Sequence, residues 1–438
     1  MKNLRAVVLV VLVLALLIVG MTQVFAQFKF SYTSGFQVQN LSSTDANVSI
    51  TYYNQDGSTA HTASDTIPAN GSTTYFPLPT QVSTGFNGSV VVSSDQAVGA
   101  VVNVLSTDFL HGGSYVGSSA GSTSLLLPLL FQNNAGFDTW FNVQNTGTTT
   151  ATVDVNYSDG TSVLGVQIAP GASHTFNQAT ETHNQAIFSA QITSDQPVAA
   201  AAIQESSSVV FAYSGFTGGS TNPVMPLINQ NNAGYVTGVQ IQNAGTQTTT
   251  VTLSYTPSLA GTACTETHDI GPGKSETFTL FAFAPNNSGV NTTCTAGEKF
   301  VGSAQVTANS TNQPLAAIVN QLSSANGEAY NAFDPATATG NLVMPLIMDR
   351  NGGFFTGFNL INVGATDTVN CTFTNSTFQI TKVITTGTGI TELQNGQIAD
   401  SYVGSATCTA SGGGQLLAVV NELGSSADQF LVYEGLNP

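Results

Sequence analysis

The segment Phe141-Asn142-Val143-Gln144-Asn145 alternates apolar and polar residues and ends in an asparagine. The same kind of segment occurs three more times, ending at Asn40, Asn243 and Asn362. These four marker asparagines lie roughly 100 to 120 residues apart, which is the size of one small domain, whereas the units of solenoid proteins have about 20 to 50 residues. The sequence therefore predicts four copies of one module arranged in tandem.

Each module is predicted to consist of short antiparallel strands. Period-two alternation indicates strands with one buried face, and a nearly continuous apolar run late in each copy suits a central strand. These runs are residues 98–102, 198–203, 315–319 and 416–420. About seven strands in ~100 residues, without a helical period, are typical of a two-sheet sandwich. A β-propeller is the competing fold, but its blades need only about 40 to 50 residues.

The modules resemble the immunoglobulin-like and fibronectin-type repeats of bacterial secreted and cell-surface proteins in strand pattern and turn spacing, without the Cys-Trp-Cys signature of antibody domains. The resemblance implies an all-β fold of four tandem immunoglobulin-like antiparallel β-sandwich domains after an N-terminal signal-peptide helix. The expected boundaries are residues 1–26 for the signal peptide and 27–119, 120–218, 219–338 and 339–438 for repeats 1 to 4. Repeat 3 carries an insertion that the other copies lack.

The N-terminal segment is expected to be a secretory signal peptide. Lys2 and Arg5 precede an apolar run over residues 6–20, and residues 24–26 (Val-Phe-Ala) supply small residues at the cleavage subsites. The mature chain then starts at Gln27. An uncleaved membrane anchor is the alternative, although the apolar run is shorter than the ~20 residues that a spanning helix needs. We expect a secreted or cell-surface protein with no membrane insertion after signal cleavage.

The composition limits the classes of partner. Only 7% of the residues are charged and 41% are hydrophobic, so the solvent-facing surface must consist largely of Ser, Thr, Asn, Gln and Gly. The formal net charge of −17 repels nucleic acids and anionic lipids. We therefore expect no binding of nucleic acid. The expected partners are other cell-surface proteins, further copies of the chain itself, or glycans.

Calcium is the one candidate cofactor. The acidic turns at Asp95, Asp195 and Asp349 are expected near repeat junctions, where oxygen ligands could converge on a divalent cation. No Asp-x-Asp-x-Asp loop accompanies them, and ordinary solvated turns explain the same residues. We therefore assign no metal ligand and no cofactor-binding residue.

Four cysteines in an exported chain favour disulfides. Cys371 and Cys408 occupy strand positions that are apolar in repeat 3 and should face one core, so we pair them. Cys264 and Cys294 bracket the insertion of repeat 3 and should staple it, which stabilises by roughly 3 to 4 kcal/mol in the chain-entropy model. Free thiols with metal or catalytic roles are the alternative, although neither pair shows a Cys-x-x-Cys spacing.

A second repeated element links the copies. Pro128, Pro226 and Pro345 each stand at the centre of an apolar pentapeptide, and each precedes the marker asparagine of its repeat by the same interval (145−128, 243−226 and 362−345 all equal 17). A flexible tether would not keep this register, so we expect an ordered edge strand at each junction, where the missing N–H of proline is tolerated. The repeats should then be coupled semi-rigidly, end to end.

The same interval places the equivalent position of repeat 1 at residue 23, inside the predicted signal peptide. One hypothesis is that an end repeat then has an open sheet edge, and that neighbouring molecules pair there by strand addition into a filament. The alternative is that residues 28–32 supply a shorter first strand.

No residue pattern indicates catalysis. The five histidines lie in loop or strand-end contexts, and none recurs across the copies. The sequence contains no HExxH, GxSxG or P-loop motif, so we nominate no catalytic residue. Trp140, the only tryptophan, replaces a glycine that the other three repeats share. It is a candidate stacking platform for a sugar ligand, and a buried junction residue is the alternative.

These features predict a secreted, non-enzymatic structural protein of the cell surface or extracellular matrix, a semi-rigid rod of repeats for coating, spacing or filament and layer assembly. An adhesin or carbohydrate-binding protein is the alternative, with specificity in Trp140 and in the stapled insertion between Cys264 and Cys294. An extracellular hydrolase would need an acidic cleft that the sequence does not locate.

Overall fold

The computed structural model describes residues 28–82, 85–424 and 428–438. The predicted signal peptide, residues 1–26, lies outside these residues. The described chain is almost entirely antiparallel β-structure, and the one helix in it is the 3-10 helix η1 (Pro335–Thr337). The expectation of an all-β antiparallel fold is confirmed.

Repeat 1 forms two sheets from seven strands. In chain order the strands are β1 (Tyr32–Asn40), β2 (Ala46–Asn54), β3 (Thr59–Ile67), β4 (Ser72–Tyr75), β5 (Gly88–Ser94), β6 (Val98–Ser106) and β7 (Gly112–Val116). One sheet has the strand order β4-β1-β6-β7, and the other has the order β3-β2-β5.

Repeat 2 adds a strand before the equivalent of β1. Its strands are β8 (Ser122–Phe131), β9 (Asp138–Asn145), β10 (Ala151–Tyr157), β11 (Ser162–Ile168), β12 (Ser173–Asn177), β13 (Ile187–Glu205) and β14 (Val210–Ser214). The long strand β13 belongs to both layers. Its first half pairs with β8 and β10, and its second half pairs with β9 and β14. The layers are therefore β8-β13-β10-β11 and β12-β9-β13-β14.

Repeats 3 and 4 show the same two layers with separate strands. Repeat 3 contains β15 (Val224–Gln230), β16 (Val236–Asn243), β17 (Thr249–Ala260), β18 (Cys264–Ile270), β19 (Ser275–Phe278), β20 (Phe300–Asn309), β21 (Leu315–Leu322) and β22 (Gly327–Asn331). Repeat 4 contains β23 (Asn341–Asp349), β24 (Phe355–Asn362), β25 (Asp367–Phe373), β26 (Gln379–Ile384), β27 (Thr388–Gln394), β28 (Tyr402–Ala410), β29 (Leu416–Leu423) and β30 (Phe430–Glu434). The sheet orders are β15-β20-β17-β18, β19-β16-β21-β22, β23-β28-β25-β26 and β27-β24-β29-β30.

The marker asparagines hold the same corner in every repeat. All four side chains are fully buried. In repeat 3, Asn243 Nδ2 donates hydrogen bonds to the carbonyl oxygens of Gln247 and Ile270, at 2.7 and 2.9 Å. Its Oδ1 accepts a bond from the Gly245 amide at 2.9 Å. The same three bonds recur at Asn40, Asn145 and Asn362. Asparagine recurs because its amide combines two donors with an acceptor in a short side chain.

The predicted junction strands are ordered edge strands. β8, β15 and β23 contain Pro128, Pro226 and Pro345, and they pair with β13, β20 and β28. The register of all three ladders shifts at the proline, so the missing N–H costs no ladder bond. Each junction strand also lies against the next repeat: β8 contacts β16 and β21, β15 contacts β24 and β29, and β23 contacts β1 and β6.

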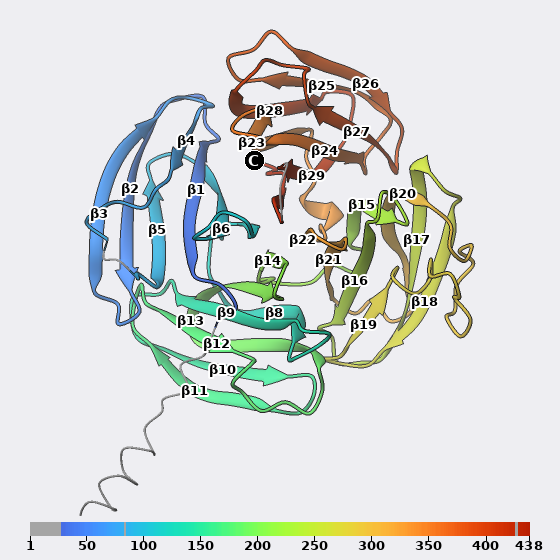
Figure 1. Cartoon of the computed structure of the whole chain (residues 1–438), viewed down its shortest axis with the longest axis horizontal. Helices are drawn as coiled ribbons and strands as arrows, with labels where there is room; N and C mark the ends of the chain where they lie inside the picture. Colours follow the sequence, from blue (N-terminus) through green and yellow to red (C-terminus); the bar gives the residue numbers. More distant parts are fainter. Residues whose placement is uncertain (1–27, 83–84, 425–427) are drawn as a thin grey trace, which may run out of the picture.

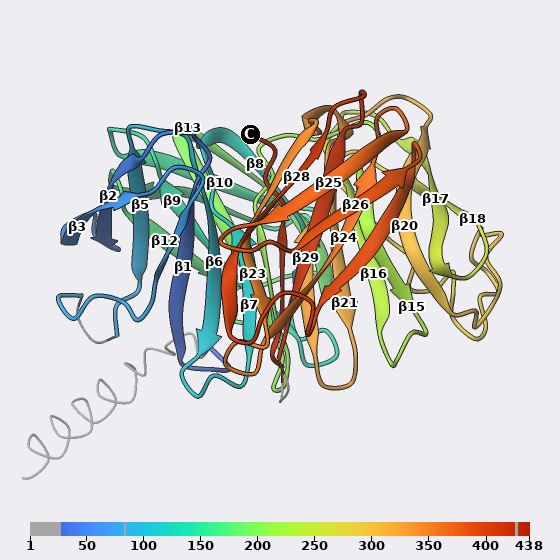
Figure 2. The ribbon, with the colours of Figure 1, turned by 90° about the horizontal axis from the view of Figure 1, so that it is seen from above.

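The four repeats form a closed ring (Figure 1). The last strand of each repeat lies at the centre, where β7 contacts β14 and β30, and β22 contacts the same two strands. Repeat 4 therefore lies beside repeat 1, and His111 forms a β-bridge with Asp428. Figure 2 shows the four repeats side by side in one layer. The expectation of an end-to-end rod is wrong.

The constant interval between the junction proline and the marker asparagine does not distinguish a rod from a ring. A constant register indicates that the junctions are alike, but it does not set the rotation between successive repeats. A head-to-tail contact that is repeated with a closing rotation produces a ring, here of four repeats (Figure 1).

Each repeat keeps an apolar core between its two sheets, and the cores are continuous across some junctions. Ile318 and Ala329 of repeat 3 pack into the core of repeat 2, and Phe430 and Val432 of repeat 4 pack into that of repeat 3. The buried core of repeat 1 is the smallest of the four. Repeat 1 is thus the least complete sandwich in the described part of the chain.

Candidate functional site at the ring axis

The central strands β7, β14, β22 and β30 each have one neighbour in their own sheet within the described chain. Each therefore turns an unpaired backbone edge toward the ring axis, where buried N–H groups need acceptors. Carboxylates from repeats 2, 3 and 4 lie at or beside these edges, and they accept hydrogen bonds across the repeat junctions. This axial acid cluster consists of Glu205, Glu328, Glu422, Asp428 and Glu434.

Glu328 on β22 connects three repeats. Its side chain is completely buried. Its Oε2 accepts a hydrogen bond from the Ser114 amide of repeat 1 at 3.1 Å, and its Oε1 accepts one from the Ala212 amide of repeat 2 at 2.9 Å. A third amide donor, that of Ala329, belongs to its own strand. One carboxylate thereby supplies acceptors to the edges of β7 and β14 together.

Asp428 of repeat 4 also connects three repeats. Its Oδ2 accepts a hydrogen bond from the Val210 amide of repeat 2, and its Oδ1 accepts one from the Gly327 amide of repeat 3, both at 2.8 Å. The side chain is buried. Repeat 4 is therefore joined to repeat 2 across the axis as well as to its neighbour in the ring.

Three further carboxylates join pairs of repeats. Glu434 on β30 accepts a hydrogen bond from the Asn331 amide of repeat 3. Glu422 on β29 accepts one from Asn103 Nδ2 of repeat 1 at 3.3 Å, and its Oε1 has no hydrogen-bond partner among the described residues. Glu205 at the end of β13 accepts bonds from the Tyr32 hydroxyl and the Lys29 amide, at 2.5 and 3.1 Å.

Burial raises the pKa of all five carboxyl groups. The pKa of Asp428 rises to about 8, and those of Glu422 and Glu434 rise to about 7. The pKa of Glu328 lies well above its ordinary value, although its three amide donors favour the ionised form. A carboxyl pKa that is raised by folding means that the folded ring takes up protons. The resulting stabilisation is complete below the ordinary pKa of about 4 and is lost as the pH rises through the folded values.

The axial acid cluster is suited to holding protons and closing the ring. It provides no metal site, because no group of three or more His, Cys, Asp or Glu side chains that could hold a metal ion occurs in residues 28–82, 85–424 and 428–438. Sequence reasoning missed the cluster because its members do not recur: the counterparts of Glu328 in the other repeats are Gly113, Phe211 and Leu431. The one available signal was an acidic residue inside a strand that is centred on a recurrent aromatic residue.

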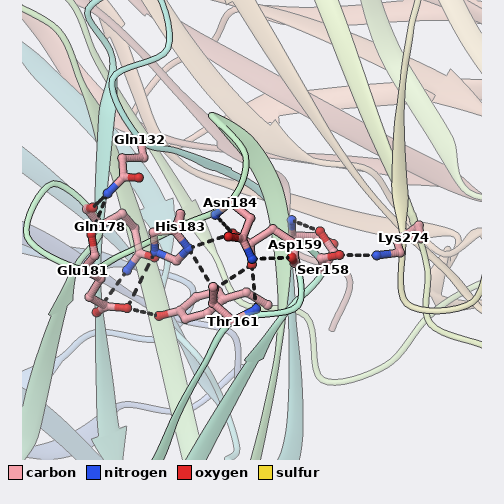
Figure 3. Close-up of polar contacts among 11 residues, drawn as sticks. Gln132, Ser158, Asp159, Thr161, Gln178, Glu181, His183, Asn184 and Lys274 are labelled. Atoms are coloured by element: carbon pink, nitrogen blue, oxygen red, sulfur yellow. Dashed lines mark hydrogen bonds and ion pairs between the residues drawn. The ribbon is translucent and has the colours of Figure 1, made fainter.

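A second polar group lies in repeat 2, where Figure 3 shows His183 between Asp159 and Glu181. His183 Nδ1 is 3.2 Å from Asp159 Oδ2 and 3.1 Å from Thr161 Oγ1, and its ring stacks on Phe188 with the centroids 4.1 Å apart. His183 Nε2 is 3.8 Å from Glu181 Oε2. Burial lowers the pKa of His183, while the charge of Asp159 opposes this.

The geometry of this pair resembles a catalytic dyad, but its polar atoms are used within the fold. The side chains of His183 and Asp159 are both 0% exposed. Asp159 also accepts the amide N–H groups of Thr161 and Asn184, at 3.0 and 2.7 Å. Lys274 of repeat 3 donates a hydrogen bond to the adjacent Ser158 carbonyl (Figure 3). The group therefore fixes a loop at the junction of repeats 2 and 3.

Trp140 does not lie on an open face. The rings of Phe28 and Tyr32, from repeat 1, pack against it with centroids 4.9 and 5.6 Å away. Next to it, Lys29 forms an ion pair of 2.7 Å with Asp138. Trp140 is partly buried and lies at the junction of repeats 1 and 2, and its role as a sugar platform stays a prediction.

The acidic turns that were considered as calcium ligands use their oxygens within the fold. Asp349 accepts amide N–H groups from residues 396, 397 and 398 at 2.7 to 2.9 Å, and also the Arg350 Nε–H at 3.0 Å. Asp95 accepts hydrogen bonds from two N–H groups of Asn47, and Asp195 accepts one from the Thr152 amide. These carboxylates hold loops within the fold.

The four cysteines form the two expected disulfides, Cys264–Cys294 and Cys371–Cys408. Cys371 and Cys408 are directly opposite each other on β25 and β28, and both are fully buried. Cys264, at the start of β18, is tied to the segment that is specific to repeat 3. The disulfides indicate an oxidising compartment.

Comparison with known proteins gives no family. No protein-family model matches the chain, and no curated protein is significantly similar to it. None of the described segments is a helix long and apolar enough to cross a membrane.

Proposed function

We propose that this chain is a secreted, non-enzymatic structural protein of the cell surface or extracellular matrix, and that it acts as a ring-shaped scaffold in coating, spacing or layer assembly. Each repeat is proposed to be an immunoglobulin-like sandwich, and the export signal is part of the proposal. The two disulfides support an extracellular location.

The observation that carries the proposal is the way the titratable groups are used. The buried carboxylates of the axial acid cluster accept hydrogen bonds from other repeats, most of them from backbone amides. In the described part of the chain, the His183–Asp159 pair has the geometry of a catalytic dyad, and both of its side chains are 0% exposed. Ionisable groups that would serve catalysis in an enzyme here join repeats to one another. A chain whose polar interior is devoted to ring closure is suited to a mechanical or spacing role.

The proposal predicts the location and the association of the protein. Immunogold labelling of intact cells should place the chain at the outer surface, and purified protein starting at Gln27 should form ordered arrays or bind isolated cell envelopes. Negative-stain electron microscopy and cosedimentation measure these two properties. Monodisperse particles that neither associate nor bind envelopes, or retention of the chain in the cytoplasm, would contradict the scaffold role.

Adhesion is the second candidate, and the stapled insertion of repeat 3 favours it. Leu259 and Phe281 are 67% and 53% exposed on either side of Cys264 in the chain, whereas large apolar side chains are usually covered. The disulfide to Cys294 holds this region in place. A glycan array and a whole-cell binding assay test the idea: saturable binding should be lost in Phe281→Ser and retained in Leu164→Ser, another exposed apolar residue in repeat 2.

A further inference from the structure

Among the described residues, the second sheet of repeat 1 has an unpaired edge. In repeats 2, 3 and 4 this sheet has four strands and starts with the proline-containing junction strand β8, β15 or β23. In repeat 1 it has three, and β5 pairs only with β2 among the described residues. The β5 edge, meaning the side of Gly88–Ser94 that faces away from β2, therefore offers backbone donors and acceptors for one more strand.

The side chains next to this edge are incompletely covered. Val90 and Val92 on β5 point into the core of repeat 1 but are only partly buried. Their counterparts beside a junction strand are almost completely buried: Ala190, Ile192, Ala304, Val306, Ala406 and Cys408 are each at most 2% exposed. A strand on the β5 edge would cover the two valines in the same way.

A tyrosine hydroxyl points to the same missing neighbour. In repeats 2, 3 and 4 a tyrosine of the central strand donates a hydrogen bond to the carbonyl of the leucine that follows the junction proline. These pairs are Tyr213 with Leu129, Tyr330 with Leu227 and Tyr433 with Leu346, at 2.7, 2.5 and 2.5 Å. Tyr115 is the counterpart in repeat 1, opposite Val102 on β6, and its hydroxyl makes no hydrogen bond to the described residues.

The location restricts what can bind. Each resident junction strand is held between its own sheet and the next repeat of the ring. Ser89 on β5 donates a hydrogen bond to the Gly171 carbonyl of repeat 2 at 2.6 Å, so the β5 edge also lies beside the next repeat. A single extended segment therefore needs less room here than the sheet edge of a second folded molecule, which brings a whole repeat with it.

The resident strands also define the chemistry of the occupant. Their central residues are Leu-Leu-Pro-Leu-Leu, Val-Met-Pro-Leu-Ile and Val-Met-Pro-Leu-Ile, without any charge. We propose that the β5 edge binds an extended, apolar and uncharged segment of a partner chain, which adds to the sheet as its fourth strand. The inference deepens the scaffold role and rests on it, since removal of the signal peptide takes away residue 23, which the repeat register places at this position.

Peptide binding tests the proposal on the mature protein starting at Gln27. The probe is a fluorescein-labelled peptide with the sequence of residues 341–348, Asn-Leu-Val-Met-Pro-Leu-Ile-Met. It should bind saturably and protect the β5 amides from hydrogen exchange, whereas a scrambled peptide of the same composition should do neither. Absence of saturable binding would overturn the proposal, as would β5 amides that are already protected without peptide, because the chain itself then covers the edge.

Two matched variants separate specific binding from general stickiness. Tyr115→Phe should weaken the peptide about fivefold, the effect of one lost hydrogen bond, without changing the melting temperature. Tyr213→Phe removes the equivalent hydroxyl from a resident strand, so it should lower the melting temperature and leave the peptide affinity unchanged. Equal affinity of Tyr115→Phe and the parent protein would refute the proposed register.

A grafted chain provides a second, independent check. Residues 341–353, placed directly before Tyr32, should fill the β5 edge from within, abolish peptide binding and protect the β5 amides. Retained peptide affinity in this chain would place the binding elsewhere and overturn the proposal. The surface-labelling and assembly assays are independent of these measurements, so failure of the β5 proposal and failure of the scaffold role are distinguishable.

Discussion

Replacing Glu422 by glutamine is expected to stabilise the ring in a pH-dependent way. Glu422 is 2% exposed, receives one long hydrogen bond from Asn103, and has one oxygen without a partner among the described residues. Burial raises its pKa from 4.5 to about 7. At a conversion of about 1.4 kcal/mol per pKa unit, the ionised form destabilises the folded state by about 3 kcal/mol above pH 7. The aligned residues Gln204 and Gln321 show that the fold accepts glutamine here.

The sign of this effect determines the two pH values at which the melting temperatures are compared. Below about pH 4 the carboxyl group is protonated in both the folded and the unfolded chain, so Glu422→Gln should leave the melting temperature nearly unchanged. At pH 8.5 the parent protein holds a buried charge that glutamine lacks, and the variant should melt on the order of 5 °C higher. Differential scanning calorimetry at the two pH values measures the difference, with the exposed Glu276→Gln as control. An equal shift at both pH values, or a lower melting temperature at pH 8.5, would refute the reasoning.

Three further predictions concern the repeat and the ring. Asn243→Ala removes three buried hydrogen bonds and should lower the stability of repeat 3 by about 3 kcal/mol in calorimetry. The control Asn286→Ala, at an exposed position, should have little effect, and equal effects would contradict the role of the marker asparagine. Cys371→Leu combined with Cys408→Val introduces the apolar residues found at these positions in repeat 3. Urea unfolding should then show a loss of stability limited to the roughly 3 to 4 kcal/mol of loop closure, whereas an unfolded protein would show that core packing was lost as well. Class averages from negative-stain microscopy should show four lobes around a centre, and extended particles would argue against the ring.

The strands could be predicted because they depend on local patterns. Alternation, turn residues and the recurrence of Asn40, Asn145, Asn243 and Asn362 indicate one fold for all four copies, since each asparagine bonds its corner in the same way. The disulfides followed from comparing repeats, because Cys371 and Cys408 stand where Leu253 and Val306 face one core. What one repeat determines by itself was accessible from the sequence.

The ring and its axis were not accessible, because they depend on contacts between repeats. The junction register is constant in a rod and in a ring alike, and the angle is set by side chains that meet only after folding. The axial acid cluster adds to this difficulty: Glu328 binds amides more than 100 residues away in the chain, at Ser114 and Ala212, and acidic residues are expected at the surface unless a partner is known. A pattern search inside one repeat has no reason to place them in the interior.

The junction of repeats 1 and 2 differs from the other junctions, since no described strand takes the place of a junction strand in repeat 1. Trp140 and Ile203 are paired on β9 and β13, where the other repeats carry glycine paired with asparagine. Both changes add apolar volume on the side of repeat 2 that faces repeat 1, and Phe28 and Tyr32 pack against the tryptophan. These rings close one end of the junction. They do not cover Val90 and Val92, which stay partly exposed.

The partial exposure of Val90 and Val92 distinguishes between the two explanations for repeat 1, an open sheet edge or a substitute strand from residues 28–32. If residues 28–32 were a sufficient substitute for a junction strand, the β5 valines would be buried and Tyr115 would have a hydrogen-bond partner, as its three counterparts do. The aromatic residues instead stabilise the ring at a single point, and no described strand pairs with the outer edge of β5. Trp140→Gly should therefore increase the amide hydrogen-exchange rates at the junction of repeats 1 and 2 without altering those of β5 itself. Increased exchange along β5 would show that the aromatic packing, rather than a partner strand, is what this edge requires.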